Sequence, residues 1–104
     1  MYARTGNLTA HPGRRAELVE ILLRASALTS SLLGCRAYIV LEDLANENSV
    51  SVFEMWADKD SHAESLRDEK VRELIAEAMP LIAGMPSGSE LRVRGGHGLE
   101  LKDH

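Results

Sequence analysis

Two neighbouring strand-like segments of this chain are apolar on both of their faces, and no other feature limits the possible folds as strongly. The segments are CRAYIVLED, residues 35–43, and SVSVFEMWA, residues 49–57, and the short turn ANEN separates them. Successive side chains of a strand point to opposite faces. Both alternating sets are apolar here: Tyr38 and Val40 against Ala37, Ile39 and Leu41, then Val50, Val52 and Trp56 against Phe53 and Met55. An antiparallel sheet with a solvated face shows polar residues at alternate positions, so both faces of this pair must be covered.

The rest of the chain supplies two more strands and two helical regions. YARTGNLTA, residues 2–10, alternates as a strand does and stops at HPG. Apolar residues at helical spacing over 18–32, with Pro12 before them and Gly34 after them, predict a helix. Asp58 and Asp68 are expected to cap two further helices, and Pro80 should bend or break the second one near its end. SELRVRGG, residues 89–96, predicts the fourth strand.

The order β-α-β-β-α-β is that of the ferredoxin-like α+β fold, in which two helices cover one face of a four-stranded antiparallel sheet. The second face of the two apolar strands would then stay uncovered. A second copy of the same sheet is the simplest cover, so we expect a homodimer that forms a dimeric α+β barrel. We expect one domain over residues 1–96, followed by a C-terminal tail at 97–104.

Composition excludes several classes of protein. Hydrophobic residues make up 44% and charged residues 27% of the chain, and the net charge is −4, which gives no basic surface for nucleic acid. No apolar stretch approaches the roughly 20 residues of a membrane span. The first residues lack the apolar core of a signal peptide. We therefore expect a cytoplasmic protein with neither nucleic acid nor a membrane as partner, and Cys35, the single cysteine, precludes an internal disulfide.

Four segments together resemble the antibiotic biosynthesis monooxygenase (ABM) domain family. They are HPG before the first helix, GCRAYIVLEDL, VFEMW and MPLIAGMPSGSEL, and the similarity extends over residues 3–96. The resemblance implies a dimeric α+β barrel with a pocket in each subunit between sheet and helices. Members include cofactor-independent oxygenases of aromatic polyketides and quinols, haem-degrading enzymes, and proteins that process small signalling molecules. The resemblance thus specifies a fold and leaves several reactions open.

Trp56 and Glu54 lie on the same face of their strand and are candidates for the pocket wall. The family places a tryptophan at this strand end, where an indole offers a flat surface for an aromatic ligand; the alternative is an ordinary core residue. Glu54 could accept a proton from a phenol or hydroquinone if desolvation raises its pKa. The alternative, which we favour, is an ion pair with an arginine of a neighbouring strand: Arg36, Arg92 or Arg94.

His62 and Tyr38 are the other two candidates for catalysis. His62 lies in the expected short helix, where a neutral imidazole could transfer a proton near physiological pH, and polyketide-oxidising relatives carry a tyrosine near this position. The alternative is an exposed helix histidine. Tyr38 could hydrogen-bond a quinone oxygen or fill the core. Haem-degrading relatives carry a histidine near the positions of Ser65 and Leu66, and this departure argues against haem.

Three residues complete the expected substrate contacts: Asn7, Val52 and Leu66. Haem-degrading relatives use an asparagine in the first strand as a pocket donor, although a shift of one residue would place Asn7 on the other face. The four histidines show no metal-ligand spacing, and no nucleotide or flavin fingerprint is present. We expect neither a metal nor a cofactor.

The sequence therefore favours a cofactor-independent monooxygenase that oxidises a phenol, hydroquinone or anthrone-like aromatic with O₂. Catalysis would rest on His62, Trp56 and Tyr38, and Glu54 would contact the substrate. A non-catalytic dimeric barrel that binds a small molecule needs the same pocket, so the sequence does not separate it from the enzyme. A haem-binding or haem-degrading protein is the third and least favoured alternative.

Overall fold

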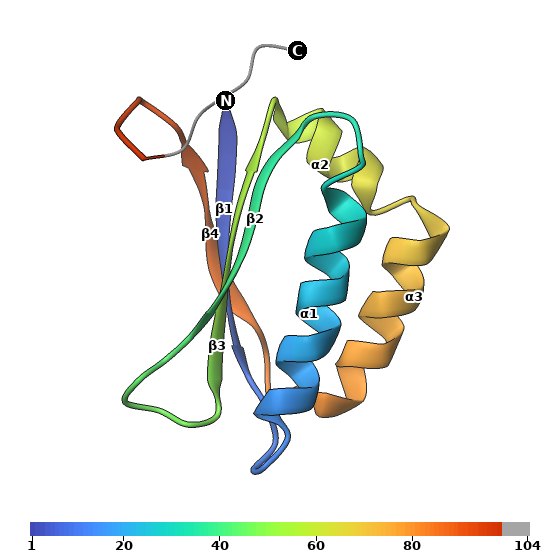
Figure 1. The fold of residues 1–104 in the computed structure, drawn as a ribbon, viewed down its shortest axis with the longest axis vertical. Coiled ribbons are helices and arrows are strands. Elements are labelled where there is room, and N and C mark those ends of the chain that lie inside the picture. The colour runs from blue at the N-terminus through green and yellow to red at the C-terminus, as the bar shows by residue number, and fades with distance from the viewer. Residues whose placement is uncertain (99–104) are drawn as a thin grey trace.

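The structure, a computed structural model, describes residues 1–98 and consists of one sheet and one layer of helices (Figure 1). Residues 99–104 of the expected tail lie outside the described residues. The elements are β1 (Tyr2–Thr9), α1 (Arg15–Thr29), β2 (Cys35–Glu42), β3 (Ser49–Trp56), α2 (Lys59–Ser65), α3 (Glu69–Ala78), the 3₁₀ helix η1 (Met79–Leu81) and β4 (Ser87–Arg92). The β-α-β-β-α-β order is confirmed, with the second helical region divided into α2 and α3.

The four strands form one antiparallel sheet in the order β2-β3-β1-β4, which confirms the ferredoxin-like topology. In the pairing of β1 with β3, Tyr2 lies opposite Trp56 and Arg4 lies opposite Glu54. In the pairing of β2 with β3, Tyr38 lies opposite Glu54 as well. Because paired residues point to the same face of a sheet, these five side chains share the face that the helices cover.

The helix boundaries follow the expected capping residues. The Asp58 carboxylate accepts a hydrogen bond from the Ser61 backbone N–H at 2.7 Å and thereby begins α2. Asp68 accepts from the backbone N–H groups of Lys70 and Val71 at the start of α3. α3 ends at Ala78, and Pro80 lies in η1, where its missing N–H costs no helical hydrogen bond.

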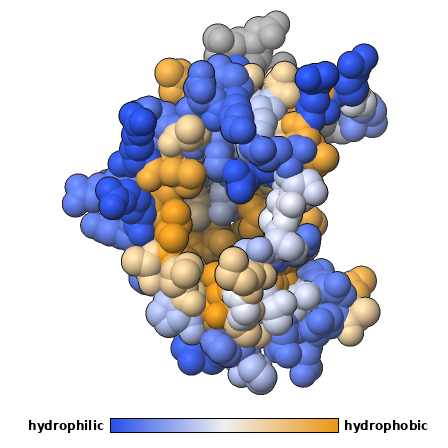
Figure 2. Space-filling view, turned by 180° about the vertical axis from the view of Figure 1, so that it is seen from behind, coloured by the Kyte–Doolittle hydropathy of each residue, from blue (hydrophilic) through white to orange (hydrophobic). Residues whose placement is uncertain are grey.

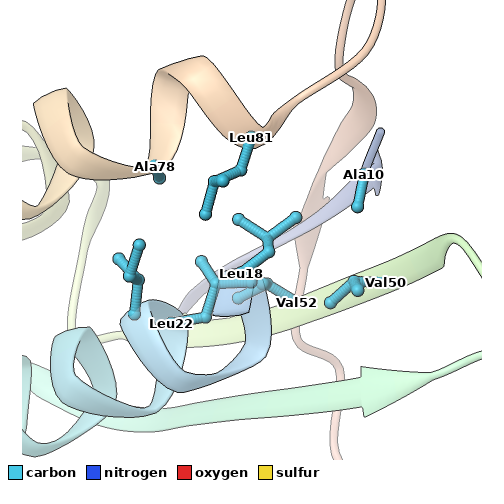
Figure 3. Packing of buried hydrophobic residues seen from close by; sticks show 8 residues of the cluster. Ala10, Leu18, Leu22, Val50, Val52, Ala78 and Leu81 are labelled. Carbon is cyan, nitrogen blue, oxygen red and sulfur yellow. The ribbon is translucent and has the colours of Figure 1, made fainter. Parts of the chain in front are cut away.

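The core lies between α1 and the centre of the sheet. α1 contributes Leu18, Ile21 and Leu22, and β3 contributes Val50 and Val52; Ala10, Ala78 and Leu81 close the cluster from the other side (Figure 3). α1 packs on β2 and β3, whereas α3 packs chiefly on α1 and η1. The helix layer therefore covers the β2–β3 half of the sheet closely and leaves more space above the β1–β4 half.

The face of the sheet away from the helices is apolar along β2 and at Phe53 and Met55 of β3, as the alternation predicted, whereas Asn7 and Ser51 make another part of it polar. Ile39, Leu41 and Leu91 on this face are 38%, 48% and 45% exposed, and Phe53 and Met55 lie between them. The half-exposed aliphatic side chains of β2 and β4, with Phe53 of β3 between them, form a hydrophobic surface that helices do not cover. No helix within residues 1–98 is long and apolar enough to span a bilayer.

Replacement of Leu18 by alanine should destabilise the protein by roughly 2–5 kcal/mol, because the side chain is fully buried and leaves a cavity. Denaturant unfolding followed by circular dichroism measures the difference. Leu33→Ala is the matched control: Leu33 is 94% exposed, so its free energy of unfolding should change by less than about 0.5 kcal/mol. Equal losses in the two variants would show that the core is not where the structure places it.

Candidate functional site

A cleft lies between the helix layer and the sheet, on the side that α3 leaves open. Its deeper part, the inner chamber, has a volume of about 230 Å³ and lies between α1, α3 and the sheet. Apolar side chains of α1 and α3 form most of its wall, and the polar side chains that reach it include Arg4, Tyr38, Glu54 and His62. Figure 2 shows this hollow from behind, with hydrophobic surface on its floor and along one side of its rim.

The cleft continues toward β4 as a second space, the outer chamber, of about 390 Å³. Both chambers are lined by Arg4, Leu22, Tyr38 and Glu54, so they adjoin along these four residues. The wall of the outer chamber is more polar, because it includes Glu90 and the strand edge around residues 87–89 of β4. The cleft thus changes from apolar inside to polar at the edge of the sheet.

Glu54 is the centre of a polar cluster on the sheet side of the cleft. Its Oε1 accepts a hydrogen bond from Trp56 Nε1 at 3.1 Å, and its Oε2 lies 3.8 Å from Arg4 Nε. His62 Nε2 is 4.0 Å from Glu54 Oε1, while His62 Nδ1 is 3.4 Å from Arg4 Nη1. One indole, one guanidinium and one imidazole therefore surround a single carboxylate.

His62 and Trp56 are packed edge to face beneath this cluster. Their ring centroids are 5.7 Å apart at 70°, and the His62 ring also lies 5.9 Å from that of Tyr2. His62 is 7% exposed, which excludes the alternative of an exposed helix histidine. Trp56 is fully buried and does not line either chamber. The indole lies behind Glu54 and His62, so it supports the wall of the cleft and is not part of its surface.

Burial and neighbouring charges set the protonation of the polar groups. Burial raises the pKa of Glu54, and the hydrogen bond from Trp56 and the charge of Arg4 offset part of that rise. Burial, with a further effect of Arg4, lowers the pKa of His62 to about 4. The pKa of Tyr38 is raised, mainly by burial and then by the charge of Glu54. Near neutral pH, His62 is therefore a neutral imidazole, Tyr38 is a protonated donor, and Glu54 is a stronger base than an exposed glutamate.

The structure brings most of the expected site residues together. Tyr38 and Glu54 line both chambers, His62 and Leu66 line the inner one, and Val52 lines the outer one. Asn7 is the exception, because it lies on the opposite face of the sheet. Its Oδ1 accepts a hydrogen bond from Ser51 Oγ at 2.8 Å there. The one-residue alternation of β1 turns Asn7 away from the cleft, so the structure removes it from the expected substrate contacts.

Arg4 belongs to the polar cluster of the cleft, although sequence reasoning missed it. The arginines expected beside Glu54 were Arg36, Arg92 and Arg94, but the antiparallel pairing of β1 with β3 places Arg4 directly opposite the glutamate. Arg4 Nη1 also donates to the Tyr2 hydroxyl at 3.4 Å. The strand order of a ferredoxin-like sheet makes β1 the neighbour of β3. An antiparallel pairing of β1 with β3 that begins with Tyr2 opposite Trp56 places Arg4 opposite Glu54 and would have predicted this contact.

Histidine is absent at the positions where haem-degrading relatives would carry it. Ser65 is buried and donates a hydrogen bond from its hydroxyl to the His62 backbone carbonyl at 2.6 Å. Leu66 presents an aliphatic side chain to the inner chamber. Within residues 1–98, no three His, Cys, Asp or Glu side chains lie close enough together to hold a metal ion.

Comparison with known proteins gives the family. The family model described as antibiotic biosynthesis monooxygenase matches residues 1–77. The chain belongs to this family. The crystal structure of a protein assigned to it, from Chloroflexus aurantiacus J-10-fl, is 34% identical, with a TM-score of 0.86, and the match covers 95% of this chain and 98% of that one.

More distant structures share the fold. A family member from Deinococcus radiodurans is 21% identical over 96% of this chain and 99% of its own, with a TM-score of 0.81. SnoaB, a cofactor-independent oxygenase from Streptomyces nogalater, is 18% identical over 91% and 94%, with a TM-score of 0.80. A search of curated proteins gives no significant match.

The buried His62 should make stability depend on pH. Its folded pKa of about 4 lies below the unfolded value of 6.5, so its contribution is present above pH 6.5 and is lost as the pH falls toward 4. Between pH 7 and pH 5 this loss amounts to about 2 kcal/mol. The raised pKa of Glu54 acts in the opposite direction, because a carboxyl that protonates more readily when folded favours the folded state at low pH.

Comparison of variants isolates the histidine. The change in the free energy of unfolding between pH 7 and pH 5 should be measured for each variant. In His62→Gln this change should be about 2 kcal/mol smaller than in the unmodified protein. His11→Gln, at an exposed position, should keep the original pH dependence. The same pH dependence in His62→Gln and the unmodified protein would show that His62 is not buried as a neutral group.

Proposed function

We propose that the protein is a cofactor-independent monooxygenase that uses O₂ to oxidise a phenol, a hydroquinone or an anthrone-like aromatic compound in the cleft. The observation that carries this proposal is the convergence of Glu54, Tyr38 and His62 on a chamber whose other walls are mostly apolar. Such a chamber accepts flat aromatic rings, excludes much of the water, and offers one base and one hydrogen-bond donor. Membership of the ABM family supports the same reaction.

The substrate supplies the electrons in this reaction. Glu54 accepts a proton from the substrate, and the resulting carbanion or phenolate gives one electron to O₂. The two radicals combine to form a carbon–oxygen bond, and the peroxide takes up the proton. Its O–O bond then breaks with loss of water. An anthrone CH₂ group and O₂ thus become a carbonyl and H₂O, and a phenol with a free ring C–H becomes a quinone with the same balance.

The geometry suggests a separate part for each side chain. Glu54 has a raised pKa and reaches both chambers, so it is a better proton acceptor than His62, whose conjugate acid has a pKa of about 4. Tyr38 remains protonated and can donate a hydrogen bond to the oxygen on which negative charge develops. His62 is a neutral partner for a substrate hydroxyl. Trp56 acts as a positioning residue, because its indole N–H holds the Glu54 carboxylate.

A homodimer is the expected assembly of this enzyme. The apolar side chains of Ile39, Leu41 and Leu91 on the outer face of the sheet are partly exposed in a single chain. Pairing of two such faces would bury them and produce the dimeric α+β barrel that the resemblance to the family implies.

A binding protein without catalytic activity is the second candidate. The observation in its favour is that Glu54 already accepts a hydrogen bond from Trp56 and faces Arg4, so its carboxylate is partly satisfied within the protein. Both candidates predict binding of an aromatic ligand in the inner chamber. Consumption of O₂ distinguishes them.

Oxygen uptake with a panel of naphthols, hydroquinones and anthrones, without added metal or reductant, tests the enzyme. Glu54→Gln should lower kcat by about 10²-fold or more, because the proton acceptor is lost. Tyr38→Phe should lower it by roughly 10²-fold through loss of the oxyanion donor. Glu20→Gln, on the exposed surface of α1, is the matched control and should keep full activity. Activity should also fall at low pH as Glu54 becomes protonated.

His62→Gln decides between the two possible proton acceptors. With Glu54 in that role, we expect the variant to retain more than about a tenth of the original kcat. A loss of about 10²-fold in His62→Gln together with full activity in Glu54→Gln would assign proton transfer to His62. No O₂ uptake with any compound, despite binding, would favour the binding protein.

Sedimentation at micromolar concentration should show a dimer. The interface of a specific dimer should bury more than about 1,000 Å² in total. Ile39→Glu should shift the protein toward monomer, because it places a charge in the middle of the proposed apolar contact. Leu33→Glu lies on an exposed connection outside that face and should leave the dimer intact. A stable monomer of the unmodified protein under these conditions would contradict the proposed assembly.

A further inference from the structure

The inner chamber alone is small for the ligands under consideration. Its volume is about 230 Å³, whereas pockets that enclose a drug-sized molecule commonly measure about 300–1,000 Å³. The outer chamber adds a space of about 390 Å³ that adjoins it along Arg4, Leu22, Tyr38 and Glu54. A ligand with several fused rings therefore needs the passage from one chamber to the other to be open.

Gly6 lines the outer chamber from the middle of β1, two residues along the same strand face from Arg4, which lines both chambers. It lies opposite Val52 of β3 on one side and Gly88 of β4 on the other, and both of these residues line the outer chamber too. A Cβ atom added at Gly6 would meet no heavy atom within 4 Å. The space above this point of the sheet is therefore open cleft, and the protein itself does not fill it.

The backbone does not require a glycine at this position. The φ angle of Gly6 is not among the positive values that favour glycine, and the interior of a strand is usually occupied by residues with side chains. Gly88 differs, because an added Cβ there would collide with the Thr5 carbonyl oxygen. The close approach of β1 and β4 thus explains Gly88, whereas the visible effect of Gly6 is to keep the cleft open.

The polarity of the two chambers indicates how a ligand would lie. Ile21, Leu22 and Ile75 help to make the inner chamber apolar, while Glu90, opposite Arg4 on the cleft face, contributes a charged group to the outer one. Aromatic rings would lie inside, and a hydroxyl or other polar substituent would lie above Gly6 toward β4.

We propose that Gly6 is a specificity-determining residue, which admits a polycyclic substrate with a polar substituent by keeping the outer chamber open beside its passage to the inner chamber. This inference rests on the proposed function, since it names the substrate class for the same cleft. A side chain at position 6 would fill part of the outer chamber beside the passage and would leave the inner chamber accessible to a single ring.

Ligand binding to Gly6→Val and Gly6→Leu tests the proposal. The probes are 1,8-dihydroxyanthraquinone, with three rings, and methylhydroquinone, with one. Fluorescence of Trp56, the single tryptophan, reports binding because its ring lies behind Glu54 and His62 in the cleft wall. We expect Gly6→Val to raise the Kd of the three-ring probe by about tenfold or more and that of the one-ring probe by less than threefold, with a larger difference in Gly6→Leu.

Two controls separate the passage from general effects on the fold. Thr9→Val changes an exposed residue of the same strand that lies outside both chambers, and it should leave both Kd values unchanged. The melting temperature of Gly6→Val should equal or exceed that of the unmodified protein, because valine suits a strand better than glycine.

Equal changes for the two probes, or no change for the three-ring probe, would overturn the assignment of Gly6. Failure of the unmodified protein to bind the three-ring probe would overturn it too. Size-dependent binding without O₂ uptake would refute the monooxygenase and support the inference about the cleft. O₂ uptake with single-ring substrates alone would support the enzyme and refute the inference.

Discussion

The packing of α3 on α1, with the sheet further away, creates the space on which the site depends. Leu18 and Leu22 of α1 contact the sheet, and Ala78 and Leu81 pack against them from the end of α3 and from η1. These contacts hold α3 in the same layer as α1, so it lies above the β1–β4 half of the sheet without packing closely on it. A closer α3 would bury more apolar area and would leave no cleft, so the site exists because the two helices share one core.

The elements of the fold were predictable because each has a local cause. Asp58 and Asp68 cap helices by hydrogen bonds to residues two or three positions away. Pro80 follows the end of α3, because it has no backbone N–H to continue the helical hydrogen bonds. Alternation in β2 and β3 identified the two apolar faces. The ferredoxin-like topology then followed from the order of the elements alone.

The details of the site depended on contacts between distant residues. Arg4 and Glu54 are fifty positions apart, and their contact is fixed by the register of β1 against β3. The burial of His62 depends on how α2 lies over the sheet, which the sequence of one short helix does not specify. Family resemblance suggested Trp56 and Asn7 as pocket residues. The structure keeps Trp56 on the expected face but buries it behind Glu54 and His62. It places Asn7 on the other face, because a difference of one residue in the alternation changes the face.

The cleft draws its residues from both ends of the chain. Tyr2 donates a hydrogen bond to Glu90 at 2.9 Å, which joins positions 88 residues apart, and β1 pairs with β4 along six residue pairs. The hairpin of β2 and β3 can form during synthesis, but the wall of the outer chamber is complete only after β4 has been made. Closure of such a long loop costs entropy before any contact compensates for it. A nascent chain would therefore form the β2–β3 hairpin early and complete the cleft after β4 has been made.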